Sequence, residues 1–316
     1  MIGRVGVITD TGRKRRHNED AYVCEPPLFA IADGMGGPQA GEVASRLAAA
    51  ALRESGASGG GEQRIVDLIQ EANRRVYDRS SSDPHTSGMG TTITVALVDD
   101  GTVAFGHVGD SRAYLIRDRT IEQITEDHSL VNELLKTGKL SPEEADTHPQ
   151  KSVITRALGT DPDVDADTFT IAAEPGDVFL LCSDGLTNMV DEDAILDLLE
   201  RDREDLDAAL RALVRAANRG GGEDNITVVA FEITDPAVHD GKTQEQAVPS
   251  ALAEPNQTTD EEDTLDETDA VPTVDGPVPV DEAAQRRHRR RRVLAWVVLV
   301  VFVLVVAALL VWRSLS

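Results

Sequence analysis

The sequence predicts a layered α+β domain built on antiparallel strands. Short apolar runs rich in β-branched residues, each bounded by turn residues, are typical of buried strands. Asp99-Asp100-Gly101 separates two such runs and predicts a hairpin. Helical periodicity appears between the strand pairs. Neighbouring strands that pair, with helices between the hairpins, favour antiparallel sheets covered by helices.

Each element follows from the spacing of its apolar residues. Strands are predicted at 5–8, 28–32, 91–98, 102–108, 113–116, 178–182 and 226–233. Helices are predicted at 41–52, 64–79, 129–136, 192–199 and 206–218. Ser141-Pro142-Glu143-Glu144 has the pattern of a capping box, with proline in the first turn of a short helix. We assign residues 1–235, which contain all of these elements, to one domain.

Composition limits the classes of function. The chain has 316 residues, of which 41% are apolar and only 3% aromatic, so we expect Val, Leu, Ile and Ala to fill the core. Its net charge of −25 would repel nucleic acid phosphates. No nucleic acid partner is therefore expected, whereas divalent cations would be attracted.

The two cysteines, Cys24 and Cys182, form neither a disulfide framework nor a zinc-binding pattern. This fits a reducing compartment. A thiol-based phosphatase needs an arginine six positions after its cysteine, but Ala30 and Asn188 stand there. The sequence therefore excludes that chemistry.

Residues 293–312 form an uncharged stretch of twenty residues, about 30 Å long as a helix, and predict a transmembrane helix. The basic segment 286–292 directly precedes it. By the positive-inside rule we expect the N-terminal region, including the domain formed by residues 1–235, in the cytoplasm. The arginines would contact anionic membrane lipids, and residues 313–316 would form a short extracytoplasmic tail.

Residues 236–285 separate the domain from this predicted membrane span. They contain thirteen acidic residues and one basic residue, with almost no periodic apolar pattern. Such a segment cannot bury enough apolar surface to offset the entropy of folding. We predict an acidic disordered linker.

Aspartates recur where predicted strands begin or end. Asp33, Asp110 and Asp184 follow apolar runs, and Asp224 precedes the last one. A single Asp-Gly pair is more simply explained as a turn, but four strand-end aspartates favour a cation site. Oxygen ligands without clustered His or Cys indicate Mg²⁺ or Mn²⁺. Ca²⁺ is less favoured because the aspartates lie far apart in sequence.

A series of motifs along the chain resembles those of the protein phosphatase 2C family, the metal-dependent (PPM-type) serine/threonine phosphatases. They are Arg15-Arg16-His17-Asn18-Glu19-Asp20, Asp33-Gly34-Met35-Gly36-Gly37, Gly41-Glu42-Val43-Ala44-Ser45, Gly90-Thr91-Thr92, Val108-Gly109-Asp110-Ser111-Arg112, Cys182-Ser183-Asp184-Gly185-Leu186 and Glu223-Asp224-Asn225-Ile226-Thr227. The match covers nearly all of residues 1–235. The predicted order of domain, linker and single membrane span resembles that of the bacterial branch of the family, whose members oppose membrane serine/threonine kinases. The resemblance implies an α-β-β-α sandwich of two antiparallel sheets flanked by helices.

The resemblance also implies a ligand set for two Mn²⁺ or Mg²⁺ ions. Asp33 would bridge them, the Gly34 carbonyl would add to the first, and Asp184 and Asp224 would bind the second. Glu19 and Asp20 would act largely through metal-bound waters. Arg15 would clamp the substrate phosphate, because the donor fork of a guanidinium matches phosphate oxygens.

Bacterial members can hold a third ion, for which Asp110 and Asp184 are the matching ligands, with Ser152 as a further candidate. Asp110 with Ser111 could instead only shape the strand turn. Residues 127–159 match the flap beside the active site, which is expected to influence docking of phosphoproteins. The alternative is a packed helical insertion with no substrate role.

The implied reaction is hydrolysis of phosphoserine and phosphothreonine by a metal-bridging hydroxide. It needs no covalent intermediate, so we expect Ser183 to be structural. Met35 stands where some members place a general-acid histidine and cannot donate a proton. The proton would come from a metal-bound water or from His148.

Two other functions stay open at this stage. The chain could be a pseudophosphatase that binds phosphoproteins without hydrolysing them, although the intact aspartates and Arg15 disfavour this. It could also act on small regulatory proteins of the anti-sigma pathway, as relatives with fused sensor domains do. We disfavour the second function because Val5 already begins the first predicted strand.

Overall fold

The computed structural model describes residues 1–36, 40–56, 59–141, 144–145 and 148–235. Its strands are β1 (Ile2–Asp10), β2 (Asp20–Glu25), β3 (Leu28–Met35), β4 (Gly90–Thr91), β5 (Ile93–Asp99), β6 (Thr102–Val108), β7 (Arg112–Arg117), β8 (Thr120–Gln123), β9 (Asp167–Ala172), β10 (Val178–Cys182) and β11 (Ile226–Ile233). Its helices are α1 (Ala40–Ser55), α2 (Gly61–Ser82), α3 (Leu130–Lys136), α5 (Asp184–Thr187), α6 (Glu192–Arg201) and α7 (Leu206–Gly220).

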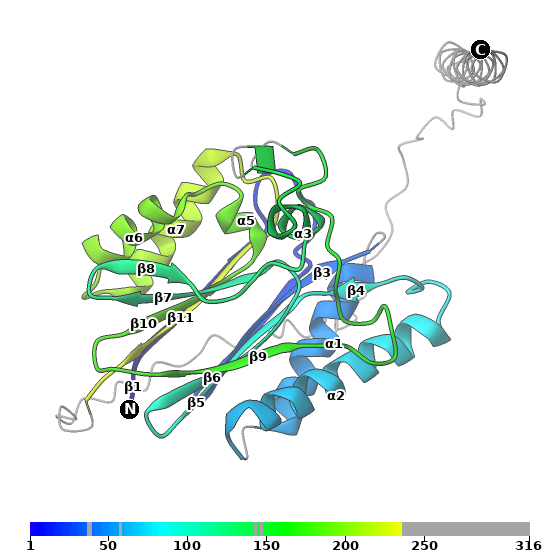
Figure 1. The fold of residues 1–316 in the computed structure, drawn as a ribbon, viewed down its shortest axis with the longest axis horizontal. Coiled ribbons are helices and arrows are strands. Elements are labelled where there is room, and N and C mark those ends of the chain that lie inside the picture. Colours follow the sequence, from blue (N-terminus) through cyan, green and yellow to red (C-terminus); the bar gives the residue numbers. More distant parts are fainter. Residues whose placement is uncertain (37–39, 57–58, 142–143, 146–147, 236–316) are drawn as a thin grey trace, which may run out of the picture. The chain divides into compact units, whose positions relative to one another are not determined.

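The strands of the described residues form two sheets, and neighbouring strands in each sheet are antiparallel. One sheet has the order β1-β11-β10-β7-β8 and the other the order β2-β3-β5-β6-β9, with β4 paired to β3. Helices α6 and α7 cover the first sheet, and α1 and α2 cover the second (Figure 1). The predicted α+β sandwich of two antiparallel sheets and flanking helices is confirmed.

Phenylalanines fill the space between the two sheets. Phe29 from β3 stacks on Phe231 from β11 with ring centroids 4.2 Å apart, and Phe179 from β10 stacks on Phe231 at 5.2 Å. Phe105 from β6 meets Phe179 at 5.5 Å. The sequence contains only six phenylalanines. Although aromatic residues are scarce, four of the phenylalanines lie in this layer, beside Ile, Leu, Val and Ala side chains from both sheets.

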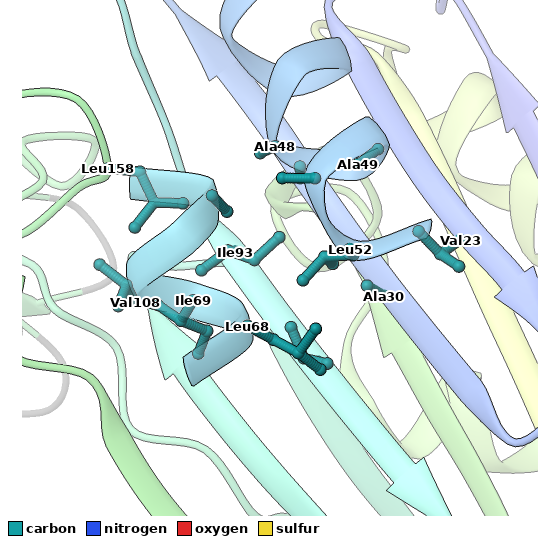
Figure 2. Close-up of a cluster of buried hydrophobic side chains, with 14 of the residues drawn as sticks. Val23, Ala30, Ala48, Ala49, Leu52, Leu68, Ile69, Ile93, Val108 and Leu158 are labelled. Atoms are coloured by element: carbon teal, nitrogen blue, oxygen red, sulfur yellow. The ribbon is translucent and has the colours of Figure 1, made fainter. Parts of the chain in front are cut away.

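Aliphatic side chains fill the layers between sheets and helices, as expected. Figure 2 shows Ala48 and Leu52 of α1 and Leu68 and Ile69 of α2 gathered with Ile93 over the β2-β3-β5-β6 face. All five are fully buried. Small alanines on α1 let the helix approach the sheet closely, which places the start of α1 against the end of β3.

The structure differs from the predicted elements in several places. The strand predicted at 91–98 divides into β4 and β5 because Thr92 turns to bond with Asp33: its backbone N–H donates to the Asp33 carbonyl (2.9 Å), and its hydroxyl accepts from the Asp33 N–H (3.0 Å). Strands β2, β8 and β9 were not predicted. Polar and charged residues hide the apolar alternation of β8 and β9, whereas β2 contains an apolar run, Ala21-Tyr22-Val23-Cys24, that the predicted strands omitted. The predicted hairpin is confirmed, with Asp100 and Gly101 at positive φ between β5 and β6.

The predicted capping box is confirmed as well. The Ser141 N–H donates to Oε2 of Glu144 (2.9 Å), and the Glu144 N–H donates to Oγ of Ser141 (3.3 Å). The predicted linker 236–285, basic segment 286–292, transmembrane helix 293–312 and tail 313–316 all lie outside the described residues. Within residues 1–235, as far as they are described, no helix is both long and apolar enough to span a bilayer.

Candidate metal centre

Asp20 and Asp33 face each other at the end of a hairpin. β2 and β3 pair so that Asp20, the first residue of β2, stands opposite Asp33. Thr227 of β11 donates its hydroxyl to Oδ2 of Asp20 (2.6 Å), and Ser183 donates to the same oxygen (3.0 Å). Asp20 therefore joins the two sheets. Its other oxygen, Oδ1, is buried and has no hydrogen-bond partner.

Asp184 reaches the same place from β10. It is the first residue of the short helix α5 rather than part of a strand-end loop, and the side-chain amide of Asn188 donates to its Oδ2 (2.9 Å). Its Oδ1, like that of Asp20, is buried without a partner. Two carboxylate oxygens that are inaccessible to solvent are thus left unsatisfied among the described residues.

The carboxylates of this cluster hold protons more tightly than usual. Burial, reinforced by neighbouring aspartates, raises the pKa of Asp20 to about 7 and that of Asp184 to about 6. Burial and the charges of Asp20 and Asp184 raise the pKa of Asp33 well above its usual value. Buried like charges that lack a counter-ion have this effect, and a bound cation would reverse it.

Asp224 and Arg15 form the exposed edge of the centre. Arg15 lies on the loop between β1 and β2, and its Nη2 donates to Oδ2 of Asp224 (2.6 Å). The Asn225 N–H donates to Oδ1 of Asp224 (2.8 Å). Both carboxylate oxygens of Asp224 therefore have partners, whereas the Arg15 side chain is 49% exposed and can reach a ligand in solvent.

Gly34 and Glu19 lie where α1 begins. A Cβ on Gly34 would lie 2.0 Å from the Gly41 carbonyl oxygen, so only glycine lets β3 and α1 meet here. The Gly34 N–H donates to the Glu19 carbonyl (3.1 Å), and the hydroxyl of Ser45 donates to that same carbonyl (2.6 Å). Burial raises the pKa of Glu19, although the charge of Arg15 opposes it.

The candidate third-ion ligands differ in their placement. Asp110 follows β6, and burial, with a contribution from the charge of Asp184, raises its pKa to about 7. Ser152 lies exposed in a turn, and within the described residues no hydrogen bond joins it to a predicted ligand. Asp110 therefore belongs electrostatically to the cluster, and Ser152 has no such connection.

Whether a divalent cation fits this cluster depends on the oxygen atoms that the cluster leaves without hydrogen-bond partners. Among the described residues, no three His, Cys, Asp or Glu side chains already stand close enough to hold a metal ion. Carboxylates repel one another without a cation, and Arg15 occupies Asp224. The unpartnered oxygens of Asp20 and Asp184 are nevertheless hard donors of the kind that Mg²⁺ and Mn²⁺ take, either directly or through a bound water. The carboxylates of this cluster therefore fit a bound Mg²⁺ or Mn²⁺ ion.

Several supporting residues were not predicted. Asn225 accepts the Glu19 N–H (2.8 Å) and donates to the carbonyls of Thr11 (2.9 Å) and His17 (3.0 Å), so it holds the loop that carries Arg15. Thr92 and Thr227 hold Asp33 and Asp20 in the same way. Their only sequence signal was their position inside or beside the motifs. Ser183, expected to be structural, donates to Asp20 and accepts the Thr227 N–H (3.0 Å).

Comparison with known proteins gives a consistent result. Residues 13–227 match the family model described as protein phosphatase 2C. The serine/threonine phosphatase stp of Listeria welshimeri is 44% identical over 236 residues, which cover 71% of this chain and 93% of that protein. The serine/threonine protein phosphatase PstP of Mycobacterium tuberculosis is 36% identical over 323 residues, which cover all of this chain and 62% of PstP.

Solved structures agree with the sequence relatives. The crystal structure of M. tuberculosis PstP superposes with a TM-score of 0.71 at 38% identity, covering 74% of this chain and 100% of that one. The PstP catalytic domain in complex with two manganese ions gives a TM-score of 0.69 at 36% identity, covering 74% and 99%. The chain therefore belongs to the protein phosphatase 2C family of serine/threonine phosphatases.

Proposed function

We propose that this chain hydrolyses phosphoserine and phosphothreonine in proteins with two Mn²⁺ or Mg²⁺ ions held between its sheets. The observation that carries the proposal is the buried carboxylate cluster of Asp20, Asp33 and Asp184, with two oxygens unpartnered and Arg15 at its open edge. When bound, such ions activate a water for in-line attack and neutralise the phosphate oxygens.

The chain's own residues would divide the remaining work. Asp33, Asp184 and Asp224 would bind the ions directly with the Gly34 carbonyl, while Asp20 and Glu19 would orient waters. Arg15 would bind the substrate phosphate through two parallel hydrogen bonds. Ser183 is turned toward Asp20 and Thr227, so it would hold the site rather than react. Asp110 would bind a third ion together with Asp184.

The direct test uses the purified full chain with a phosphothreonine peptide. Phosphate release should require Mn²⁺ and should be lost in Asp33→Asn, which keeps the shape of the side chain but removes its charge. Tight phosphopeptide binding without release at any Mn²⁺ concentration would instead establish a pseudophosphatase. A substrate preference for small regulatory proteins over phosphopeptides would favour the anti-sigma alternative.

We also propose that residues 293–312 anchor the protein in the cell membrane, with the catalytic domain in the cytoplasm. The uncharged stretch and the arginine-rich segment 286–292 support this topology. The arginines would bind anionic lipids. Protease added outside intact cells should leave residues 1–285 uncut, and cleavage within the domain would refute the proposed orientation.

A membrane serine/threonine kinase is the proposed opposing partner, since an anchored phosphatase meets membrane substrates at high local concentration. The experiment compares phosphoproteomes with and without the gene. Sites that rise on deletion should include residues of a membrane kinase. If no membrane protein gains phosphorylation, this partner assignment is wrong.

A further inference from the structure

Both backbone groups of Gly109, the residue before Asp110, are held by His128. The backbone N–H of His128 donates to the Gly109 carbonyl (2.7 Å), and the Gly109 N–H donates to Nδ1 of the His128 ring (3.1 Å). His128 is 7% exposed. It lies 18 positions along the chain from Asp110, in the segment 127–159, so this contact is made by the fold.

Gly109 needs this external support because it has no side chain of its own and cannot carry one. Its φ is +116°, and a Cβ would lie 2.6 Å from the Cβ of Thr92. A backbone in this conformation, followed directly by a ligand carboxylate, is free to rotate unless its N–H and C=O are bound. His128 binds both.

The hydrogen bonds assign the proton of the His128 ring. Because Nδ1 accepts from Gly109, a neutral ring carries its proton on Nε2, which donates to Oδ2 of Asp167 (3.1 Å). Arg156 Nη1 donates to Oδ1 of Asp167 (2.7 Å). It also lies 3.1 Å from His128 Nε2, but two donors cannot bond to each other. Asp167 thus orients His128, and Arg156 orients Asp167.

A second histidine packs against the first. The His107 ring centroid lies 4.9 Å from that of His128. Burial and the neighbouring His128 lower the pKa of His107 to about 4, so it is neutral at ordinary pH. Its Nδ1 lies 3.0 Å from the Thr94 hydroxyl, which donates to the Ser111 carbonyl (3.0 Å). The residues on both sides of Asp110 are therefore anchored.

We propose that His128 is a positioning residue for Asp110, acting through the Gly109 peptide in a chain that runs from Arg156 and Asp167. This inference rests on the proposed role of Asp110 as a metal ligand. It also links the Asp110 turn to the segment 127–159. The Thr155 N–H donates to the His128 carbonyl (2.8 Å), and Ser129 forms a β-bridge with Ile154. His128 therefore belongs both to the base of this segment and to the support of the Asp110 turn.

Two amide substitutions of His128 test the roles of Nδ1 and Nε2 separately. In His128→Asn the side-chain oxygen lies near the position of Nδ1 and can still accept from Gly109, but it cannot reach Asp167. In His128→Gln the longer amide reaches Asp167 and leaves the Gly109 N–H without an acceptor. Both variants remove the ring, so a merely structural role would affect both alike.

The experiment measures Mn²⁺ binding to the full chain. Binding is monitored by titration calorimetry and by the electron paramagnetic resonance signal of free Mn²⁺. His128→Gln should weaken the most weakly bound Mn²⁺ by about tenfold or more, as loss of an outer-shell partner does. It should raise the Mn²⁺ concentration for half-maximal phosphatase activity while kcat at saturating Mn²⁺ is retained. His128→Asn should bind Mn²⁺ nearly as wild type.

Asp110→Asn serves as the reference, and Asp167→Ala as a second test that leaves the core intact because the Asp167 side chain is 42% exposed. Asp167→Ala should shift Mn²⁺ affinity in the same direction as His128→Gln, because without Asp167 the ring proton can move to Nδ1, which then no longer accepts from Gly109. The amide oxygen of His128→Asn has no such second tautomer, so that variant keeps the acceptor without Asp167. If Asp110→Asn weakens Mn²⁺ binding but His128→Gln and Asp167→Ala do not, the positioning role is refuted. If Asp110→Asn itself has no effect, the ligand assignment fails and the inference falls with it, whatever the phosphatase activity.

Discussion

Arg15 Nη2 donates to Oδ2 of Asp224 across 2.6 Å, and this contact joins the loop after the first strand to the residue pair that opens the last. Arg15, which we propose binds the substrate phosphate, is therefore hydrogen-bonded to Asp224, which we propose binds a metal ion. A cation that binds Asp224 would compete with Arg15 for the same carboxylate. The guanidinium would then be released toward the substrate phosphate.

Arg15→Ala should lower kcat/KM for a phosphothreonine peptide by about 10- to 100-fold, the loss expected for a hydrogen bond to a charged group. Its Mn²⁺ affinity should stay the same or rise, because a competing cation is gone. Arg15→Lys, which keeps the charge but not the fork, should recover only part of the activity. Weaker Mn²⁺ binding in Arg15→Ala would show that Arg15 supports the ligands instead.

The metal-free protein should become more stable as the pH falls from about 8 to about 5. The raised pKa of Asp20 means that the folded state binds this proton more tightly than the unfolded chain, so stability decreases as pH rises through about 7. Thermal melting in EDTA across this range measures the slope. Asp20→Asn keeps an oxygen for Thr227, removes the titration and should flatten the slope; an unchanged slope would rule out Asp20 as its source.

Mn²⁺ should reverse that pH trend. Because protons and cations compete for the same carboxylates, Mn²⁺ affinity should increase with pH. Mn²⁺ at about one hundred times its dissociation constant should stabilise the fold by about 2.7 kcal/mol, which a shift in the melting temperature reports. Chelation should abolish phosphate release and added Mn²⁺ should restore it. A metal-independent melting temperature would contradict the proposed centre.

Ser183→Ala should retain phosphatase activity, because the hydroxyl is turned to Asp20 and Thr227. It should destabilise the protein by about 1–3 kcal/mol, since the buried Thr227 N–H loses its side-chain acceptor. Steady-state kinetics and denaturant unfolding test the two parts separately. Complete loss of turnover in a folded Ser183→Ala protein would revive a covalent mechanism.

The differences between prediction and structure have physical causes. β9 was missed because Asp167 and the threonines of Asp167–Ala172 obscure its alternation, yet this strand brings Asp167 to His128. The strand predicted through Thr92 is broken because its hydroxyl bonds to Asp33, a contact between residues 59 positions apart. Local propensity contains no information about such a partner.

The sequence by itself determined the class of the fold, the motifs of the family and the residue types of the site, because hydrophobic periodicity and ligand chemistry are written residue by residue. It also supplied the predicted linker and span in 236–316. Only the tertiary structure decided which carboxylate oxygens are left without partners, that Arg15 rests on Asp224, and that His128 holds Gly109. Those relationships depend on sheet register and burial, which bring distant residues together and remove the water that would otherwise satisfy them.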